Sequence, residues 1–156
     1  AQELGILVDV SHISDAGFWD IMKITQAPVI ASHSNSRAVC PHARNLTDDM
    51  FRAIRDTGGV AGINQFAGFL GGKPTLDTIC DHIFHFLEMD PECRHIALGG
   101  DLDGCDALAQ GFEGVQSYPA LAQRLLERGL TEEMVMNLYW NNALGVMDAA
   151  VRNNKK

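Results

Sequence analysis

Two histidines and one aspartate are the residues of this chain best suited to carry out chemistry. His12 and His33 each follow a short apolar run, and Asp101 follows a third such run after Gly99 and Gly100. Imidazole nitrogens bind zinc at about 2.0–2.1 Å. A carboxylate beside a metal-bound water can take a proton from that water and pass it to a leaving amine. These residue types therefore suit a zinc-dependent hydrolytic site, if the fold brings them together.

Each of these residues also has a simpler interpretation. A histidine at a strand end can be a hydrogen-bonded core or rim residue with no metal to bind. The stretch 101–104, Asp-Leu-Asp-Gly, is good turn sequence. It is not an EF-hand loop, because Gly104 comes fourth in it, whereas the calcium-binding loop has its glycine at the sixth position. The residues alone leave the catalytic and the structural interpretations open.

Arg44 lies in the loop that follows His33, within Cys-Pro-His-Ala-Arg-Asn. A planar guanidinium group can bind both oxygens of a carboxylate, so an arginine over a metal site suits a substrate carboxylate. The alternative is a solvated loop arginine, and the same alternative applies to His42. The chain has no nucleophile elbow, P-loop or dinucleotide-binding fingerprint, since the glycines at 67–72 have the wrong spacing for the last of these.

Alternating strands and helices are expected to position these side chains. Apolar, β-rich runs predict four strands, at 6–10, 28–32, 60–64 and 95–99. Amphipathic stretches with a hydroxyl residue or proline at their start predict six helices, at 15–24, 48–56, 75–88, 119–128, 132–139 and 142–151. The predicted N-terminal caps are Ser14, Thr47, Thr75 and Thr131.

Strands that each precede a helix predict an α/β fold of parallel (β/α) units with right-handed crossovers. Two architectures fit this pattern. One is a small open sheet, and the other is half of a (β/α)8 barrel, a fold of about 250 residues. In both, functional groups gather at the carboxyl ends of the strands. His12, His33, Asn64 and Asp101 would then lie at one edge of the sheet, with neighbouring strands about 4.8 Å apart.

Length and composition describe an ordinary globular chain. It has 156 residues, 46% of them hydrophobic and 21% charged, and a formal net charge of −8. We expect one unit over 1–156, either a single domain or the carboxyl-terminal half of a barrel. The acidic balance argues against nucleic acid as a partner. No run approaches the roughly 20 apolar residues of a membrane span.

The four cysteines, Cys40, Cys80, Cys93 and Cys105, form no CxxC pair and are expected to be free, partly buried thiols. A zinc site from the nearby cysteines and histidines at 80–95 is a rival interpretation. The apolar stripe of the helix at 75–88 argues against it, because His82 and His85 fall off that stripe and are expected at the surface or rim.

In its strand-end motifs the chain resembles the membrane (renal-type) dipeptidases, peptidase family M19. The resemblance runs from near residue 4 to near residue 147. It rests on four motifs in order: Asp9-Val-Ser-His12-Ile-Ser, Pro28-Val-Ile-Ala-Ser-His33-Ser, Arg44-Asn45-Leu-Thr-Asp48-Asp49 and Gly99-Gly100-Asp101-Leu-Asp103-Gly104.

The resemblance implies a dipeptidase with two zinc ions on a (β/α)8 barrel. His12 and His33 match the two histidines that bind one of the zinc ions. Arg44 matches the arginine that holds the substrate's C-terminal carboxylate, and Asp101 matches the catalytic acid/base. The implied reaction is attack of a metal-activated water on the carbonyl of a dipeptide.

The chain also departs from the family pattern. The family's His-x-Asp pair, its bridging glutamate and a further substrate-contacting histidine belong upstream of Ala1. Residues 1–4 resemble the last turn of a helix that Gly5 ends, so we expect a chain cut from something longer and equivalent to strands five to eight. Two histidines are too few for a tight zinc site. We therefore expect the chain alone to be inactive, to bind zinc weakly or not at all, and to need the missing N-terminal half as its partner.

Two other functions stay open on the sequence. One is an amidohydrolase-type enzyme that acts on a non-peptide amide. The other is a non-catalytic α/β interaction domain, a stable monomer in which His12 and His33 can be replaced without effect. A half-barrel, by contrast, has two open sheet edges and is expected to associate, for example as a homo-oligomer. Free cysteines and the lack of a visible signal peptide favour a cytoplasmic enzyme.

Overall fold

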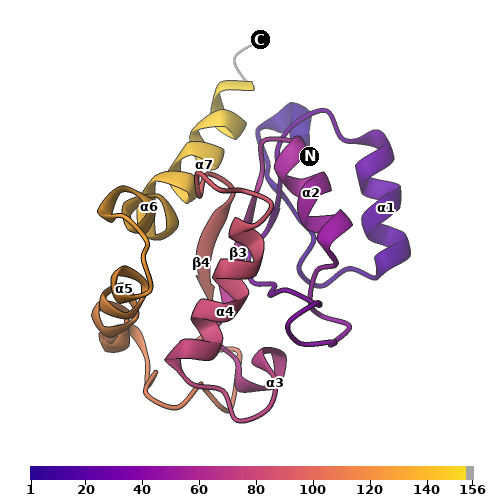
Figure 1. Ribbon diagram of the computed structural model, residues 1–156. Coiled ribbons are helices and arrows are strands. Elements are labelled where there is room, and N and C mark those ends of the chain that lie inside the picture. The colour runs from indigo at the N-terminus through magenta and orange to yellow at the C-terminus, as the bar shows by residue number, and fades with distance from the viewer. Residues whose placement is uncertain (154–156) are drawn as a thin grey trace.

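Four parallel strands form one sheet, in the same order, β1 to β4, as along the chain. The computed structural model in Figure 1 describes residues 1–153. Its strands are β1 (Val8–Asp9), β2 (Val29–Ala31), β3 (Val60–Asn64) and β4 (Ile96–Gly100). Each strand pairs in parallel with the next, so each connection crosses from one end of the sheet to the other. The predicted α/β fold of parallel (β/α) units is confirmed.

Helices follow every strand. In Figure 1, α4 passes in front of β3 and β4, with α1 and α2 on one side of it and α5 to α7 on the other. The helical segments are η1 (Gln2–Leu4), α1 (Asp15–Ile24), α2 (Asp48–Asp56), α3 (Ala67–Leu70), α4 (Leu76–Leu87), η2 (Val115–Ser117), α5 (Tyr118–Glu127), α6 (Glu132–Met136), the π-helical turn η3 (Asn137–Asn141) and α7 (Asn142–Asn153). Within residues 1–153, none of these helices has the length and apolarity needed to span a membrane.

Hydroxyl side chains begin the helices that they were predicted to begin. The hydroxyls of Ser14, Thr47 and Thr131 each accept a 3.2 Å hydrogen bond from the backbone amide three residues further on. Thr75 instead donates its own amide to the Thr78 hydroxyl at 3.1 Å. Each contact satisfies a polar group that a helix start would otherwise leave without a partner.

The core lies between the sheet and the helices α2 and α4. Val29, Ala61 and Ile63 face this core from β2 and β3 and are fully buried. Phe51 of α2 and Phe86 of α4 stack over them, with ring centroids 4.2 Å apart and ring planes within 4° of parallel. The apolar periodicity of α2 and α4 thus fixes how the two helices are oriented on the sheet.

On the other face of the sheet, the backbone that leaves β2 packs directly against two glycines. Residues alternate between the two faces of a strand, so Gly62 and Gly99 point away from the core that Ile63 faces. A Cβ atom at either glycine would overlap the carbonyl oxygen of Ser32. The chain that leaves β2 therefore crosses these two glycines directly, and His33 is carried with it over the neighbouring strands.

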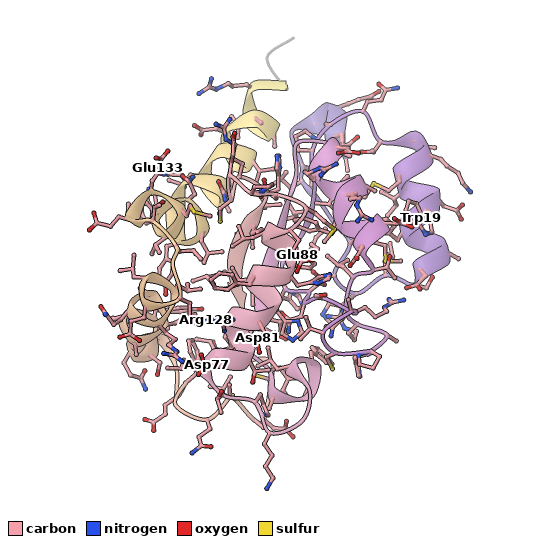
Figure 2. The ribbon with its side chains drawn as sticks, viewed as in Figure 1. Trp19, Asp77, Asp81, Glu88, Arg128 and Glu133 are labelled. Atoms are coloured by element: carbon pink, nitrogen blue, oxygen red, sulfur yellow. The ribbon has the colours of Figure 1, made fainter. Side chains whose placement is uncertain are left out.

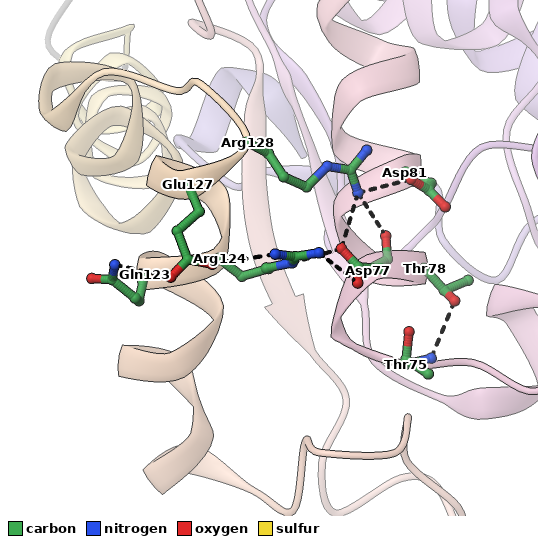
Figure 3. Close-up of polar contacts among 8 residues, drawn as sticks. All are labelled: Thr75, Asp77, Thr78, Asp81, Gln123, Arg124, Glu127 and Arg128. Atoms are coloured by element: carbon green, nitrogen blue, oxygen red, sulfur yellow. Dashed lines mark hydrogen bonds and ion pairs between the residues drawn. The ribbon is translucent and has the colours of Figure 1, made fainter.

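Ion pairs connect α5 to α4 on the outside of the fold. Figure 2 places Asp77, Asp81 and Arg128 together where the two helices meet. In Figure 3, the Arg124 guanidinium binds both carboxylate oxygens of Asp77, at 2.7 and 2.9 Å. Arg128 pairs with Asp81 at 2.8 Å and lies over the Phe84 ring, 4.6 Å from its centroid. This cluster positions α5 and is separate from the strand ends.

Several element boundaries differ from those predicted. The first strand is short, Val8–Asp9 rather than 6–10, and Ile6 is exposed ahead of it. The glycine-containing stretch after β3 was not predicted to be helical, but it forms the single turn of α3. The helix predicted at 132–139 ends at Met136 and continues as η3.

The prediction that His82 lies at the surface or rim is wrong. His82 is fully buried. Its Nδ1 accepts a hydrogen bond from the Ser36 amide at 3.1 Å, and its Nε2 lies 3.2 Å from the Leu70 carbonyl oxygen, to which it donates. The helix periodicity failed here because the loop after β2 and the turn α3 cover this side of α4. His85 is only partly exposed and binds Asp48 at 2.8 Å.

Candidate functional site

The two predicted histidines meet at the carboxyl ends of β1 and β2. The Nε2 atoms of His12 and His33 are 2.8 Å apart, and their ring centroids are 4.9 Å apart. Tetrahedral zinc with bonds of about 2.0–2.1 Å needs its nitrogen ligands about 3.3 Å apart. A small rotation of either ring would provide that separation, so the geometry suits two imidazoles on one metal ion.

A polar network contacts His33 on the Nδ1 side of its ring, away from His12. Its Nδ1 lies 2.7 Å from the Ser32 hydroxyl, which donates to Asp9 Oδ2 at 2.5 Å. The other oxygen of Asp9 accepts the backbone amides of Ser11 and Ser32, both at 3.0 Å. The Ser11 hydroxyl in turn accepts the His33 amide at 2.9 Å. The polar groups of the Ser32–His33 peptide are thus held from the side of β1.

The charges of the site act on the pKa of His33. Burial lowers this pKa most, while the negative charge of Asp101 opposes the effect and the nearby His12 and Arg44 add to it. The net shift favours the neutral imidazole, which is the form that binds metals. Burial raises the pKa of Asp9, but the hydrogen bonds from Ser32 and Ser11 outweigh burial, so this carboxyl has a lowered pKa.

Asp101 stands at the end of β4 in an unusual backbone conformation. Its φ is +61°, directly after Gly100 at +74°. Left-handed conformations are uncommon for non-glycine residues, and such strain tends to occur at functional sites. Asn64, at the end of β3, donates its Nδ2 to Asp101 Oδ2 at 3.2 Å. A Cβ at Gly104 would overlap the Asp101 carboxylate and displace it, so this glycine leaves room for the side chain.

Arg44 differs from the other arginine in its loop. Arg37 has partners for its nitrogens, including both Asp15 carboxylate oxygens at 2.7 and 2.9 Å. Arg44 Nη2 is buried and has no hydrogen-bond partner. Its guanidinium lies 5.4 Å from the centroid of the Phe69 ring. Burial lowers the pKa of Arg44, and the charges of Asp101 and Asp9 oppose that effect. Arg44 is therefore available for an anion that the described chain does not supply.

Buried amides hold the Arg44 loop in place. Asn45 Nδ2 donates to the carbonyl oxygens of Cys40 and Phe69, at 2.9 and 2.8 Å. The Arg44 amide donates to His42 Nδ1 at 3.1 Å, and the His42 ring packs on Phe69. These contacts place the loop after β2 against α3, so the position of Arg44 depends on two separate segments of the chain.

The described residues do not complete a metal site. Residues 1–153 contain no group of three or more histidine, cysteine or carboxylate ligands around one point. A protein zinc site has at least three such ligands, so His12 and His33 fit as two of them. The rival set at 80–95 does not converge, because His82 faces Leu70, His85 faces Asp48, and His95 binds the Gly59 carbonyl oxygen at 2.9 Å. All four cysteines are free thiols, as predicted.

The family model for membrane dipeptidases, peptidase family M19, matches residues 1–156. The chain belongs to this family. An uncharacterised dipeptidase of Schizosaccharomyces pombe is 36% identical over 146 residues, which are 92% of this chain and 36% of that protein. The resemblance of the motifs around His12, His33, Arg44 and Asp101 to this family is confirmed at the level of family membership.

Solved structures of peptidases share the fold of this chain. A metallo peptidase of Rhodobacter sphaeroides, liganded with a phosphinate mimic of L-Ala-D-Ala, aligns with a TM-score of 0.89 and 31% identity. The alignment covers 96% of this chain and 44% of that one. A probable dipeptidase of Pseudomonas aeruginosa, 18% identical, has a TM-score of 0.91 over 97% and 52% of the two chains and shows the likeness of fold alone. The chain thus spans about half or less of the length of these relatives.

The structure also shows site residues that the sequence analysis missed. Asp9, Ser32 and Asn45 lie within the motifs that were singled out, but only their neighbours received a role. Asn64 was noted at a strand end, and its contact with Asp101 needs the folded sheet. Phe69 gave no indication in sequence, since it becomes part of the site only when α3 packs on the Arg44 loop.

Proposed function

We propose that this M19 chain supplies the metal-binding histidines, the carboxylate clamp and the acid/base of a zinc-dependent dipeptidase. One observation carries the proposal. Two imidazole Nε2 atoms 2.8 Å apart share a cluster with a carboxylate on left-handed backbone and a buried, unpartnered guanidinium nitrogen. A purely structural cluster would pair these groups with one another.

His12 and His33 would hold one zinc ion through their Nε2 atoms. A bound zinc ion supplies a polarised substrate carbonyl and a water that ionises near neutral pH. Asp101 accepts the proton of the attacking water and delivers it to the departing amine. Asn64 holds Asp101 Oδ2 through the 3.2 Å hydrogen bond, and the Asp101 charge is near enough to His33 to oppose the lowering of the pKa of His33.

Arg44 would bind the C-terminal carboxylate of a dipeptide. Its unpartnered Nη2 offers a charge-assisted hydrogen bond, and contact with Phe69 limits the orientations of the guanidinium plane. The similarity to a metallo peptidase liganded with a mimic of L-Ala-D-Ala supports a dipeptide as the substrate class. A longer peptide would place an amide rather than a carboxylate at Arg44, so its binding would be weaker.

Zinc binding requires ligands beyond those that residues 1–153 provide. We propose that they come from a second (β/α) half that pairs with the open edges of β1 and β4 and closes a barrel. The chain by itself would then be inactive and bind zinc weakly or not at all. The coverage of the relatives supports this proposal, because each relative extends well beyond the segment that aligns.

The test compares the 156-residue chain alone with the same chain joined to the N-terminal half of the Rhodobacter relative. Zinc content and hydrolysis of L-Ala-D-Ala are measured in both. We expect zinc and turnover only in the joined protein, with loss of zinc in His33→Ala and no loss in the control His85→Ala. Stoichiometric zinc and turnover in the chain alone would refute the proposal that further ligands are needed. Cleavage of cyclic amides instead of dipeptides would refute the substrate class.

A further inference from the structure

We propose that Asp9 and Ser32 are positioning residues, which fix the proton of the His33 ring on Nδ1 and so turn an Nε2 lone pair toward His12. Neither residue reaches the point where the two Nε2 atoms meet. Both act through the ring of His33, by hydrogen bonds of 2.5 Å between Ser32 and Asp9 and 2.7 Å between Ser32 and His33 Nδ1.

The direction of these hydrogen bonds follows from counting protons. Asp9 is a carboxylate at neutral pH and can only accept. The Ser32 hydroxyl has one proton, and the 2.5 Å contact with Asp9 Oδ2 uses it. The 2.7 Å contact between Ser32 Oγ and His33 Nδ1 therefore needs a proton from the ring. His33 must be the Nδ1–H tautomer, and its Nε2 is an acceptor.

The backbone keeps this chain of hydrogen bonds in place. Asp9 Oδ1 accepts the amides of Ser11 and Ser32, so the carboxylate cannot rotate away from the Ser32 hydroxyl without losing two further hydrogen bonds. Gly62 and Gly99 support the other side of the Ser32–His33 peptide, since the Ser32 carbonyl oxygen fills the space of their missing Cβ atoms. The backbone of His33 is thus held from β1, β3 and β4 together, and its ring is held through Ser32.

A fixed tautomer matters at a metal site, because a neutral imidazole binds a metal only through its unprotonated nitrogen. With His33 as the Nδ1–H tautomer, the proton of the 2.8 Å contact between the two Nε2 atoms comes from His12, and it would move to His12 Nδ1 when a metal ion binds at Nε2. The consequence for metal binding rests on the proposed function, whereas the tautomer of His33 does not.

The decisive variant is Asp9→Asn, which is designed to reverse the chain of hydrogen bonds. The amide oxygen of the new side chain can still accept the hydrogen bonds from the Ser11 and Ser32 amides, while its NH2 group takes the place of Oδ2. That group donates to Ser32 Oγ, so the hydroxyl proton turns to His33 Nδ1 and the ring proton moves to Nε2. Ser32→Ala removes the link and leaves the Asp9 contacts with both backbone amides.

The tautomers are read by long-range 1H–15N correlation NMR on the 15N-labelled chain without metal. We expect the Nδ1–H form of His33 in the wild type, the Nε2–H form in Asp9→Asn and a mixture of both in Ser32→Ala. The control is Asp20→Asn, which changes an exposed aspartate that pairs with Lys23 on α1. It should leave the His33 signals unchanged.

Two results would overturn the proposal: an Nε2–H form in the wild type, or an unchanged Nδ1–H form in Asp9→Asn. If Asp9→Asn does not fold, Ser32→Ala decides, and a pure Nδ1–H form there contradicts the proposal. Zinc affinity of the joined protein, measured by competition with a chelator, should fall about 10–100-fold in both variants. Absence of zinc binding in the joined wild type would refute the proposed function but not the NMR result.

Discussion

At the scale of single residues, the candidate site is marked by polar groups whose hydrogen bonding is incomplete. The guanidinium of Arg37 is satisfied by Asp15 and by backbone carbonyls, whereas Arg44 keeps a buried nitrogen without a partner. A buried donor without a partner costs about 1–3 kcal/mol, and more if it is charged. Such a cost is expected where a ligand supplies the missing acceptor.

Replacing Arg44 by methionine should therefore stabilise the chain. The Arg44→Met side chain keeps the packing on Phe69 and removes the unpaired charge, so the free energy of unfolding in urea should rise by about 1 kcal/mol. The matched control is Arg52→Met, at an exposed residue that pairs with Asp49. This control should change stability by less than about 0.5 kcal/mol. A loss of stability in Arg44→Met would show that Arg44 is structural.

His82 should make the fold sensitive to acid. Burial lowers the pKa of His82 below its ordinary value of 6.5, although hydrogen bonds to Leu70 and Ser36 oppose the shift. The unfolded chain then binds more protons than the folded chain below about pH 6.5, so stability falls as the pH falls through that range. At neutral pH and above, both states are deprotonated and this effect disappears.

The test compares unfolding in urea between pH 7.5 and pH 5.5 for the wild type and His82→Asn. The asparagine oxygen can still accept the Ser36 amide but loses the bond to Leu70, at a cost of about 1–2 kcal/mol at pH 7.5. The slope of stability against pH should decrease by up to about 1.4 kcal/mol per pH unit. An unchanged slope would assign the acid sensitivity to other groups, such as His33, whose pKa is also lowered.

At the scale of elements, parallel strands deliver the site by ending at one edge of the sheet. The registers place Asp9, at the end of β1, beside Ile30, and Ala31, at the end of β2, beside Ala61, from which β3 continues to Asn64. The segment from β2 to His33 then crosses Gly62 and Gly99, which carries His33 over the neighbouring strands. The ion pairs of Figure 3 position α5 on α4, but they lie outside the sheet and leave the site untouched.

Gly99→Ala should disrupt both the fold and the site. The new Cβ would overlap the Ser32 carbonyl oxygen and crowd His33, and overpacking of this kind costs about 1–3 kcal/mol or more. The matched control is Gly145→Ala in α7, where nothing lies within 4 Å of the new Cβ. The control should gain about 0.5–1 kcal/mol, because alanine is the better helix former. Equal effects of the two changes on urea unfolding would contradict this account.

At the scale of the whole molecule, the described residues leave sheet edges unpaired and apolar side chains exposed. β1 and β4 each have a strand neighbour on one side only. An open hollow of about 810 Å³ lies at the amino end of β1, lined by residues such as Val8, Ile21 and Thr25. An apolar stripe runs along η3 and α7, with each side chain at least 44% exposed: Trp140, Leu144, Met147 and Val151. Exposed apolar surface of this kind indicates a site of association.

The chain in isolation should therefore self-associate. Sedimentation velocity over a concentration series should show species larger than a monomer for the wild type. The double variant Leu144→Gln, Met147→Gln should shift this equilibrium toward the monomer, whereas Asp148→Asn, an exposed polar change on the same helix, should not. A wild type that is monomeric at all concentrations would favour the alternative of a self-standing α/β interaction domain.

Much of this arrangement could be predicted from the sequence. Apolar runs and hydroxyl caps are local properties, so β3 was predicted residue for residue and the starts of α1 and α2 at Asp15 and Asp48 were predicted correctly. The M19 motifs led to His12, His33, Arg44 and Asp101 because each motif is contiguous, and all but the Arg44 motif lie at a strand end. Alternation of strands and helices likewise predicted the parallel sheet.

Tertiary structure alone decided how those residues are held. The burial of His82, the proton chain from Asp9 through Ser32 to His33, and the contact of Phe69 with Arg44 all join segments far apart in the sequence. The direction of a side chain at a strand end depends on which other segments pack over that end, and local periodicity does not encode this. Chain connectivity therefore determined which groups reach the end of the sheet, and packing across strands determined which nitrogen of His33 faces outward.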